Sequence, residues 1–171
     1  MNIYLTSGTP EYMEQVRAKY PNEKMIVLYG EGNAVLLHET EGKTVFQSPR
    51  KFEAIDSINE LKGTGYYVLN NIPVTEEGRP VFEHRFLSRK GSIENEPGFI
   101  AFRLMRPIGE ETYIVLTEWA GPESFKAWTE SQAFRNSHAE KKPEGAKPPV
   151  NIFSAASYVT TYQTAKQQDE A

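Results

Sequence analysis

The order of the apolar segments in the second half of the chain constrains its fold more than any other feature. The segment YYVLNNIPV is rich in β-branched and aromatic residues and predicts a strand that ends at Pro73. The next segment, TEEGRPVFEHRFLSRKG, predicts a helix, because Pro80 fits a first helical turn and an apolar stripe follows it. A strand therefore leads directly into a helix.

A hairpin, a second helix and a final strand come next. FIAFRLMRP and TYIVLTEWA predict two strands joined by a turn at residues 108–111. A helix is predicted from Pro122 to Glu140, and NIFSAASYVTTYQT predicts the last strand. The order strand, helix, strand, strand, helix, strand is the split βαβ arrangement of ferredoxin-like domains, so an α+β fold is expected.

The first part of the chain, residues 1–65, resembles a reduced copy of the same unit, with no second helix before its Gly-Thr-Gly hinge. A four-stranded sheet with helices on one face needs a second sheet to bury its other face. We therefore predict an intramolecular pseudo-dimer with a barrel-like sheet, built from residues 1–65 and 66–162 and followed by a polar tail at 163–171. The predicted elements of the first part are NIYLTS, the helix PEYMEQVRAKY, MIVLYG, AVLLHET and KTVFQS.

Composition narrows the possible functions. The formal net charge of −4 disfavours a broad phosphate-binding surface, so nucleic acid is not an expected partner. No apolar run approaches the roughly 20 residues of a membrane span, and the N-terminus lacks the layout of a signal peptide, which together predict a cytoplasmic protein. The absence of cysteine excludes thiolate metal sites, and the three histidines, His38, His84 and His138, are too dispersed for a multi-histidine motif.

The predicted helix GPESFKAWTESQAFRNSHAEK carries the residues most suited to chemistry. Phe125 and Trp128 are three residues apart, and Phe134 and His138 are four apart, so each pair shares a helical face. In a continuous helix Trp128 and His138 would lie only about 80° apart in azimuth. A cavity lined by these rings and offering one imidazole suits a flat apolar ligand with a metal at its centre.

Spacing alone leaves other interpretations of these residues open. A histidine near a helix C-terminus often complements the helix dipole in solvent, and Trp128 could simply fill the core. Ser131 could cap a restart, which would break the helix there. For His84, beside the apolar stripe of its helix, and for His38, at the polar end of a strand, a solvated position is the expected one.

Asn70 and Asn71 are unusual inside an apolar strand. An asparagine that points inward must find a hydrogen-bond partner or cost on the order of 1–3 kcal/mol. One interpretation is a donor directed at a ligand, and the other is a β-bulge or strand end before Pro73.

At this point residues 66–162 resemble a known family, the IsdG-like haem-degrading monooxygenases of the antibiotic-biosynthesis-monooxygenase superfamily. The strand that contains Asn70 is similar to the family's opening strand and places the family's functional asparagine at Asn70. With its added first part, the whole chain is similar to longer members of the family. The most specific part of the resemblance is the spacing F-x-x-W-x-x-S-x-x-F-x-x-x-H, carried here by Phe125, Trp128, Ser131, Phe134 and His138.

The resemblance implies oxidative cleavage of the haem ring with release of iron. Haem would be both substrate and cofactor, used together with O2 and an external electron donor, either a reductase or a small-molecule reductant. It implies that His138 is the proximal iron ligand, that Trp128 presses on the porphyrin so that it buckles, and that Asn70 hydrogen-bonds near the iron-bound ligand. Phe125 and Phe134 would line the same haem pocket.

Two departures and two alternatives accompany this resemblance. Family members usually dimerise through their sheets, whereas this chain carries an extra half, which predicts a monomer. Pro73 departs from the family pattern at the rim near Asn70. One alternative function is a haem-binding or stress-signalling protein without turnover. The other is a cofactor-free monooxygenase that acts on an aromatic metabolite.

Overall fold

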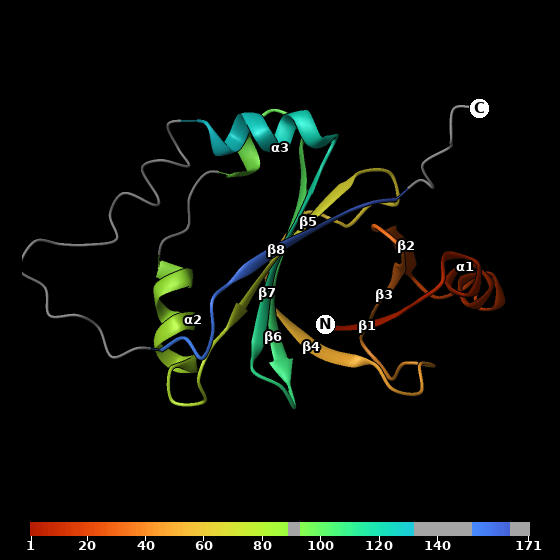
Figure 1. Cartoon of the computed structure of the whole chain (residues 1–171), viewed down its shortest axis with the longest axis horizontal. Helices are drawn as coiled ribbons and strands as arrows, with labels where there is room; N and C mark the ends of the chain where they lie inside the picture. Colours follow the sequence, from red (N-terminus) through yellow and green to blue (C-terminus); the bar gives the residue numbers. More distant parts are fainter. Residues whose placement is uncertain (89–92, 132–151, 165–171) are drawn as a thin grey trace, which may run out of the picture.

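The strands of the chain close into a barrel, with the helices outside it (Figure 1). The computed structural model describes residues 1–88, 93–131 and 152–164. In chain order, its elements are β1 (Asn2–Gly8), α1 (Pro10–Lys19), β2 (Met25–Tyr29), β3 (Ala34–Thr40), β4 (Arg50–Ile58), β5 (Tyr66–Pro73), α2 (Arg79–Ser88), a short 3₁₀ helix (Ile93–Asn95), β6 (Phe99–Ile108), β7 (Thr112–Trp119), α3 (Pro122–Thr129) and β8 (Tyr158–Gln163).

The barrel consists of two four-stranded sheets with the strand order of a ferredoxin-like fold. Around the barrel the second sheet runs β8-β5-β7-β6 and the first runs β4-β1-β3-β2. One seam between the sheets is long, because β4 pairs with β6 from Lys51 opposite Ile108 to Ile58 opposite Phe102. The other seam joins β2 to β8 at the single pair of Tyr29 with Gln163. The α+β, ferredoxin-like prediction is thus confirmed, and the pseudo-dimer stays a prediction.

Local sequence placed the elements of the second sheet well. β5 ends at Pro73, and Pro80 lies in the first turn of α2, as expected. The β6–β7 hairpin turns where predicted, with Gly109 at a positive φ of 83° that favours glycine. The last strand is shorter than predicted, since β8 begins only at Tyr158 and Phe153 makes an isolated bridge to Val74.

The predicted strand KTVFQS is wrong. The fourth strand of the first sheet is β4, which begins two residues later, at Arg50. The Thr44 hydroxyl accepts a hydrogen bond from the backbone N–H of Phe46 and lies 2.9 Å from Nδ1 of His38. These local bonds hold the segment in a loop that packs over the sheet instead of pairing at its edge.

Three apolar clusters fill the layers. The largest lies inside the barrel and includes Ile3, Leu28, Leu69 and Leu116. The other two lie outside it, one beneath α2 and one beneath α1. Because neighbouring side chains of a strand point to opposite faces, each half buries both faces of its central strands.

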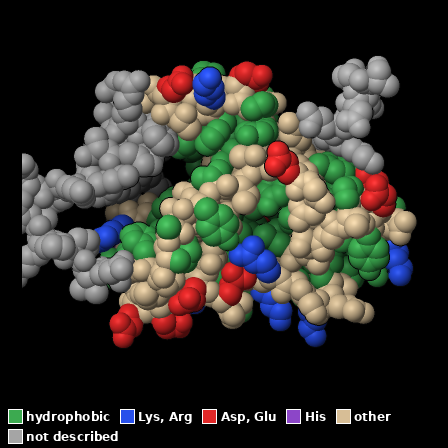
Figure 2. Space-filling view, in the orientation of Figure 1, with side chains coloured by type: hydrophobic (Ala, Val, Ile, Leu, Met, Phe, Trp, Pro, Cys, Tyr) green, Lys and Arg blue, Asp and Glu red, His purple; other side chains and the backbone are tan. Residues whose placement is uncertain are grey.

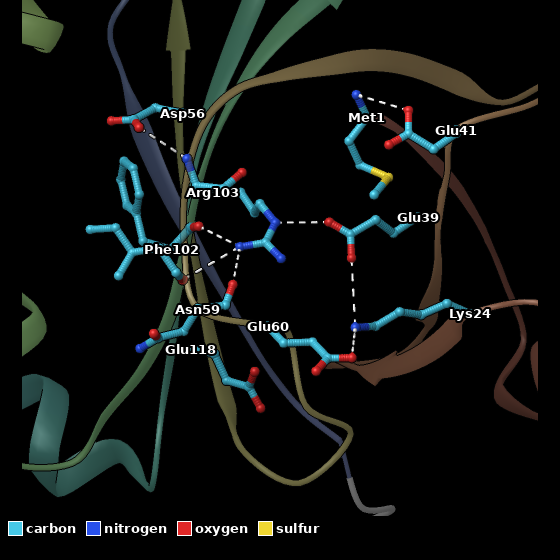
Figure 3. A network of polar contacts seen from close by, with 12 residues as sticks. Met1, Lys24, Glu39, Glu41, Asp56, Asn59, Glu60, Phe102, Arg103 and Glu118 are labelled. Carbon is cyan, nitrogen blue, oxygen red and sulfur yellow. Dashed lines mark hydrogen bonds and ion pairs between the residues drawn. The ribbon is translucent and has the colours of Figure 1, made fainter.

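The barrel interior also holds a buried ion pair that joins the two sheets (Figure 3). Nε of Arg103 in β6 donates to Oε2 of Glu39 in β3 at 2.8 Å. Nη1 of Arg103 donates to the carbonyl oxygens of Asn59 at 2.7 Å and Phe102 at 2.8 Å. Lys24 lies 3.7 Å from the other Glu39 oxygen. Both charges are therefore compensated, as buried charges must be.

Glu118 of β7 is a second buried carboxyl in the interior, with fewer partners. Its Oε1 accepts the backbone N–H of Lys62 at 2.8 Å, whereas its Oε2 has no hydrogen-bond partner among the described residues. Burial raises the pKa of Glu118, and the hydrogen bond from Lys62 opposes this effect. Burial is also the main cause that raises the pKa of Tyr67, whose hydroxyl donates to the Lys62 carbonyl at 2.6 Å.

The outer surface is mixed in charge. Acidic and basic side chains are interspersed with hydrophobic ones on the face shown in Figure 2. Within the described ranges no helix is both long enough and apolar enough to cross a membrane.

Candidate functional site

An aromatic cluster joins α3 to the outer face of the second sheet. Trp119, at the end of β7, is fully buried, and its ring centroid lies 5.5 Å from that of Trp128 and 5.9 Å from that of Phe125. Phe125 and Trp128 are 6.2 Å apart on α3, so the predicted shared face of this pair is confirmed. Phe99 meets the Trp119 ring edge-on at 5.7 Å. The result is an apolar aromatic platform under and along α3.

The start of α3 is positioned by a close backbone contact. Gly98 has a φ of +82°, and a Cβ there would overlap the side chain of Ser124. Its carbonyl accepts the backbone N–H of Ala120 at 2.7 Å, just before Pro122 begins the helix. Only glycine allows the chain before β6 to approach the helix this closely.

Asn70 lies on the same outer face of the sheet as this platform. It pairs with Val115 of β7, whereas Tyr66, four residues earlier on β5, pairs with Trp119. Four residues of strand span about 13 Å, so Asn70 lies about this distance along the sheet from the aromatic cluster. A medium-sized ligand could contact both. The Asn70 side chain is half-buried, and the described residues offer it no hydrogen bond.

Asn71 points the other way, into the barrel, and is 3% exposed. Its Nδ2 donates to the carbonyls of Leu69 at 3.0 Å and Tyr158 at 3.3 Å, and to Oγ1 of Thr160 at 3.3 Å. The two asparagines thus differ in their side-chain hydrogen bonds. The side-chain amide of Asn71 donates to protein acceptors, whereas that of Asn70 makes no hydrogen bond with the described residues.

The helix α2 covers the other end of the outer face. Phe82 and Phe86 pack over the sheet, and Phe86 stacks on Phe102 at 6.0 Å. Glu83 binds Arg106 at 2.7 and 2.8 Å, and the ion pair with Arg106 is the main cause that lowers the pKa of Glu83. These contacts fix α2 on the sheet.

The predicted helix from Pro122 to Glu140 is not continuous, and it is interrupted where the sequence allowed a break. α3 ends at Thr129, and Ser131 Oγ donates to the Trp128 carbonyl at 2.7 Å, so the chain leaves helical geometry near the predicted break. The argument that placed Trp128 and His138 on one face of a continuous helix therefore fails. Phe134 and His138 themselves lie outside the described residues.

The other two histidines differ from each other. His84 is exposed on α2, as predicted. The solvated position predicted for His38 is wrong, because His38 is fully buried with Nε2 2.7 Å from Oε1 of Glu23. The Phe46 ring meets it edge-on at 5.6 Å. Its burial depends on partners far away in sequence, which strand periodicity does not contain.

Sequence reasoning missed Trp119 as a site residue. A tryptophan at the end of a strand is expected to fill the core. Trp119 does so in part, because its ring is buried and its Nε1 donates to Thr117 Oγ1 at 2.9 Å. The available signal was alternation along β7, which places Trp119 on the same face as Tyr113 and Val115.

Comparison with known proteins identifies the class of this domain. Residues 65–140 match the family model described as antibiotic biosynthesis monooxygenase. This part of the chain is therefore similar to monooxygenase domains of this kind.

The relatives found by sequence comparison are named as signal transduction proteins, not as haem-degrading enzymes. Signal transduction protein TRAP of Staphylococcus aureus is 29% identical over 139 residues, which are 81% of this chain and 83% of that protein. The expectation that the nearest likeness is to a long haem-degrading member is thus not supported by these relatives.

Solved structures share the fold over nearly the whole chain. A structure described as a major regulator of staphylococcal pathogenesis superposes with a TM-score of 0.83 at 23% identity and covers 97% of this chain and 100% of that one. LmHde, a heme-degrading enzyme from Listeria monocytogenes, superposes with a TM-score of 0.70 at 19% identity and covers 96% and 100%. Both likenesses extend through the first sheet as well as the monooxygenase domain.

Proposed function

We propose that this protein is a haem-degrading monooxygenase that binds haem on the outer face of its second sheet, between α3 and Asn70. The observation that carries the proposal is the pairing of an aromatic platform with an unused, half-buried amide on the same face. A flat apolar macrocycle needs extensive apolar contact and a few placed polar groups, and this face offers both.

Each residue has a distinct role in the proposal. Trp128, braced from below by Trp119 and beside Phe125, contacts one part of the ring and biases it away from planarity. Asn70 would supply the side-chain amide that hydrogen-bonds the bound molecule. His138 and Phe134 stay in the roles implied by the family resemblance, as iron ligand and pocket lining.

Haem, when bound, supplies the iron that activates O2, and its ring is also the substrate. The protein's part is to hold and orient the ring and to keep water from the reacting edge. His138 would be the protein group that holds the iron. Electrons come from an external donor, a reductase or a small-molecule reductant.

A second function is favoured by the relatives named as signal transduction proteins. In that case the same face binds haem as a signal, and the haem ring stays intact. The two proposals share a binding site and differ in turnover.

One titration followed by a decay measurement tests both. Purified full-length protein should give a Soret band with added haem, and ascorbate with O2 should then bleach the band and release chelatable iron. A stable Soret band under reductant and O2 would favour the signalling function. No Soret band, or full binding and turnover by His138→Ala, would contradict both.

A further inference from the structure

The barrel contains a cavity on the opposite face of β5 from the proposed haem site. It measures about 360 Å³ and is lined by residues of β1, β3, β5 and β8 and of the chain around the start of β4. Its size falls within the range of small-molecule sites. Its location follows from the seam described above, where β2 and β8 pair only at Tyr29 and Gln163, so the wall beside β8 is incomplete in the described residues.

A buried acceptor faces this cavity. Asn71 lines it, is 3% exposed, and donates its Nδ2 hydrogens to three protein acceptors. None of the described residues donates to its Oδ1, and this oxygen is not closed off from solvent. An amide oxygen that receives no hydrogen bond from the protein can accept one from a molecule bound in the cavity. A ligand with a hydroxyl or amino group could therefore donate a hydrogen bond to Asn71 at the floor of the cavity.

The guanidinium of Arg50 lies at the rim of the cavity. Arg50 lines the cavity and holds Glu110 through its Nε and Nη2, both at 2.9 Å. A guanidinium has five N–H donors, so this pair leaves donors for a second anion. Glu110 does not line the cavity, and no acidic residue does among the described lining residues. An anionic group is therefore favoured at the rim and a cationic one is not.

The space between floor and rim is mixed. Leu5, Val35 and Leu69 form part of the wall, together with Tyr162, whose ring packs against the barrel core. The other lining residues add hydroxyl groups: Thr6, Ser7, Ser48 and Thr160. A single aromatic ring that carries polar substituents suits such a wall.

We propose that this cavity binds a small aromatic carboxylate carrying a hydroxyl group, with the hydroxyl donating to Asn71 and the carboxylate bound by Arg50. The site does not depend on haem, because Asn71 and Asn70 face opposite sides of the same strand. The protein would thus carry two ligand sites that share one strand.

The test uses the full-length, haem-free chain and three probes measured by calorimetry and ligand-observed NMR: para-hydroxybenzoate, benzoate and phenol. One hydrogen bond to a buried acceptor corresponds to about a tenfold gain in affinity, so para-hydroxybenzoate should bind about tenfold more tightly than benzoate. Asn71→Leu should abolish that difference. Arg50→Gln should weaken both carboxylates about tenfold and leave phenol unchanged.

Two further variants keep the test decisive. Ser7→Phe places a large ring at an exposed position of the lining and should remove binding without touching the core, even if Asn71→Leu fails to fold. His84→Ala is the control, because His84 is exposed on α2, outside the barrel, and this variant should bind all three probes like the wild type. No binding of para-hydroxybenzoate at millimolar concentration, equal binding of benzoate, or binding unaffected by Ser7→Phe would overturn the proposal.

Discussion

The two halves of this barrel treat the outer faces of their sheets in opposite ways. In the first half the loop before β4 folds over the sheet, and Phe46 packs on His38, whose two ring nitrogens contact Glu23 and Thr44. In the second half α2 and α3 stand at the two ends of the face, and the side chain of Asn70 between them has no hydrogen bond from the described residues. One half has closed its face with its own side chains, and the other leaves a side-chain amide without a described partner.

The buried carboxylates repeat this contrast inside the barrel. Glu39 and Glu118 each lie one residue before the end of β3 and β7, the corresponding central strands of the two sheets. Glu39 is paired with Arg103, whereas Glu118 leaves one oxygen without a partner. Among the described residues, the buried carboxylate of the first half is thus fully paired, whereas that of the second half is not.

Removing the aromatic floor should have the largest effect. Trp119→Ala deletes a fully buried ring that supports both Phe125 and Trp128. We expect a loss of about 3–5 kcal/mol in the free energy of unfolding, typical of large-to-small changes in a core. Urea denaturation measures it. A loss below about 1 kcal/mol would mean that α3 is held without this contact.

The three histidines allow a direct test of the contrast between halves. His38→Ala removes a buried ring and two polar contacts in the closed half, so it should cost about 2–3 kcal/mol of stability. Haem affinity should not change. His84→Ala, on the exposed side of α2, is the matched control and should shift stability by less than about 0.5 kcal/mol. A His38 variant as stable as the His84 variant would contradict the closed face.

Substitution of Trp128 tests the aromatic platform while leaving Trp119 beneath it in place. Trp128→Ala should weaken haem binding by about tenfold or more, because an aromatic contact surface is lost from the open half. Trp128→Phe keeps a ring and should recover most of the affinity while slowing ring opening. Haem titration followed by single-turnover decay separates the two effects. Equal affinity of the alanine variant and the wild type would remove Trp128 from the site.

Asn70→Ala should leave stability unchanged, because its side chain is unbonded within the described ranges. Loss of one hydrogen bond to the ligand should slow haem turnover about tenfold. The rate of Soret decay under reductant and O2 reports this. An unaltered rate would show that the amide does not reach the reacting side of the ring.

The smallest effect concerns the pH dependence of stability. Because burial raises the pKa of Glu118, the folded protein keeps a proton on this carboxyl after the unfolded chain has released it. Stability should therefore fall as pH rises from the ordinary glutamate pKa to the raised one. Glu118→Gln should remove this decline in urea melts across that range.

Glu83 provides the control of opposite sign. The pKa of Glu83 is lowered by Arg106, so its contribution is present above the ordinary glutamate pKa and is lost as pH falls. Glu83→Gln should therefore flatten the acid side of the profile, not the side above it. Identical profiles for both variants would contradict the assigned causes.

How much the sequence could predict depended on how local each feature is. Pro73, Pro80 and the turn at Gly109 act through their own backbone, so the elements of the second sheet were predictable. The burial of His38 depends on a distant loop, and its predicted exposure was wrong. A pattern within one strand contains no information about which distant segment will cover it.

The same limit applies to the proposed site. Spacing predicted that Phe125 and Trp128 share a face, and the structure agrees. It could not reveal Trp119 beneath them, because that contact joins two elements. The continuous helix to His138 failed because a serine side chain at the helix end competes with the backbone.

The location of bound iron tests the central claim most directly. Crystals of the haem complex, measured at the iron absorption edge, would place the metal independently of any variant. We predict one iron on the outer face of the second sheet, between α3 and Asn70, with His138 as its protein ligand. Iron bound at His84, inside the barrel or over the first sheet would contradict the account.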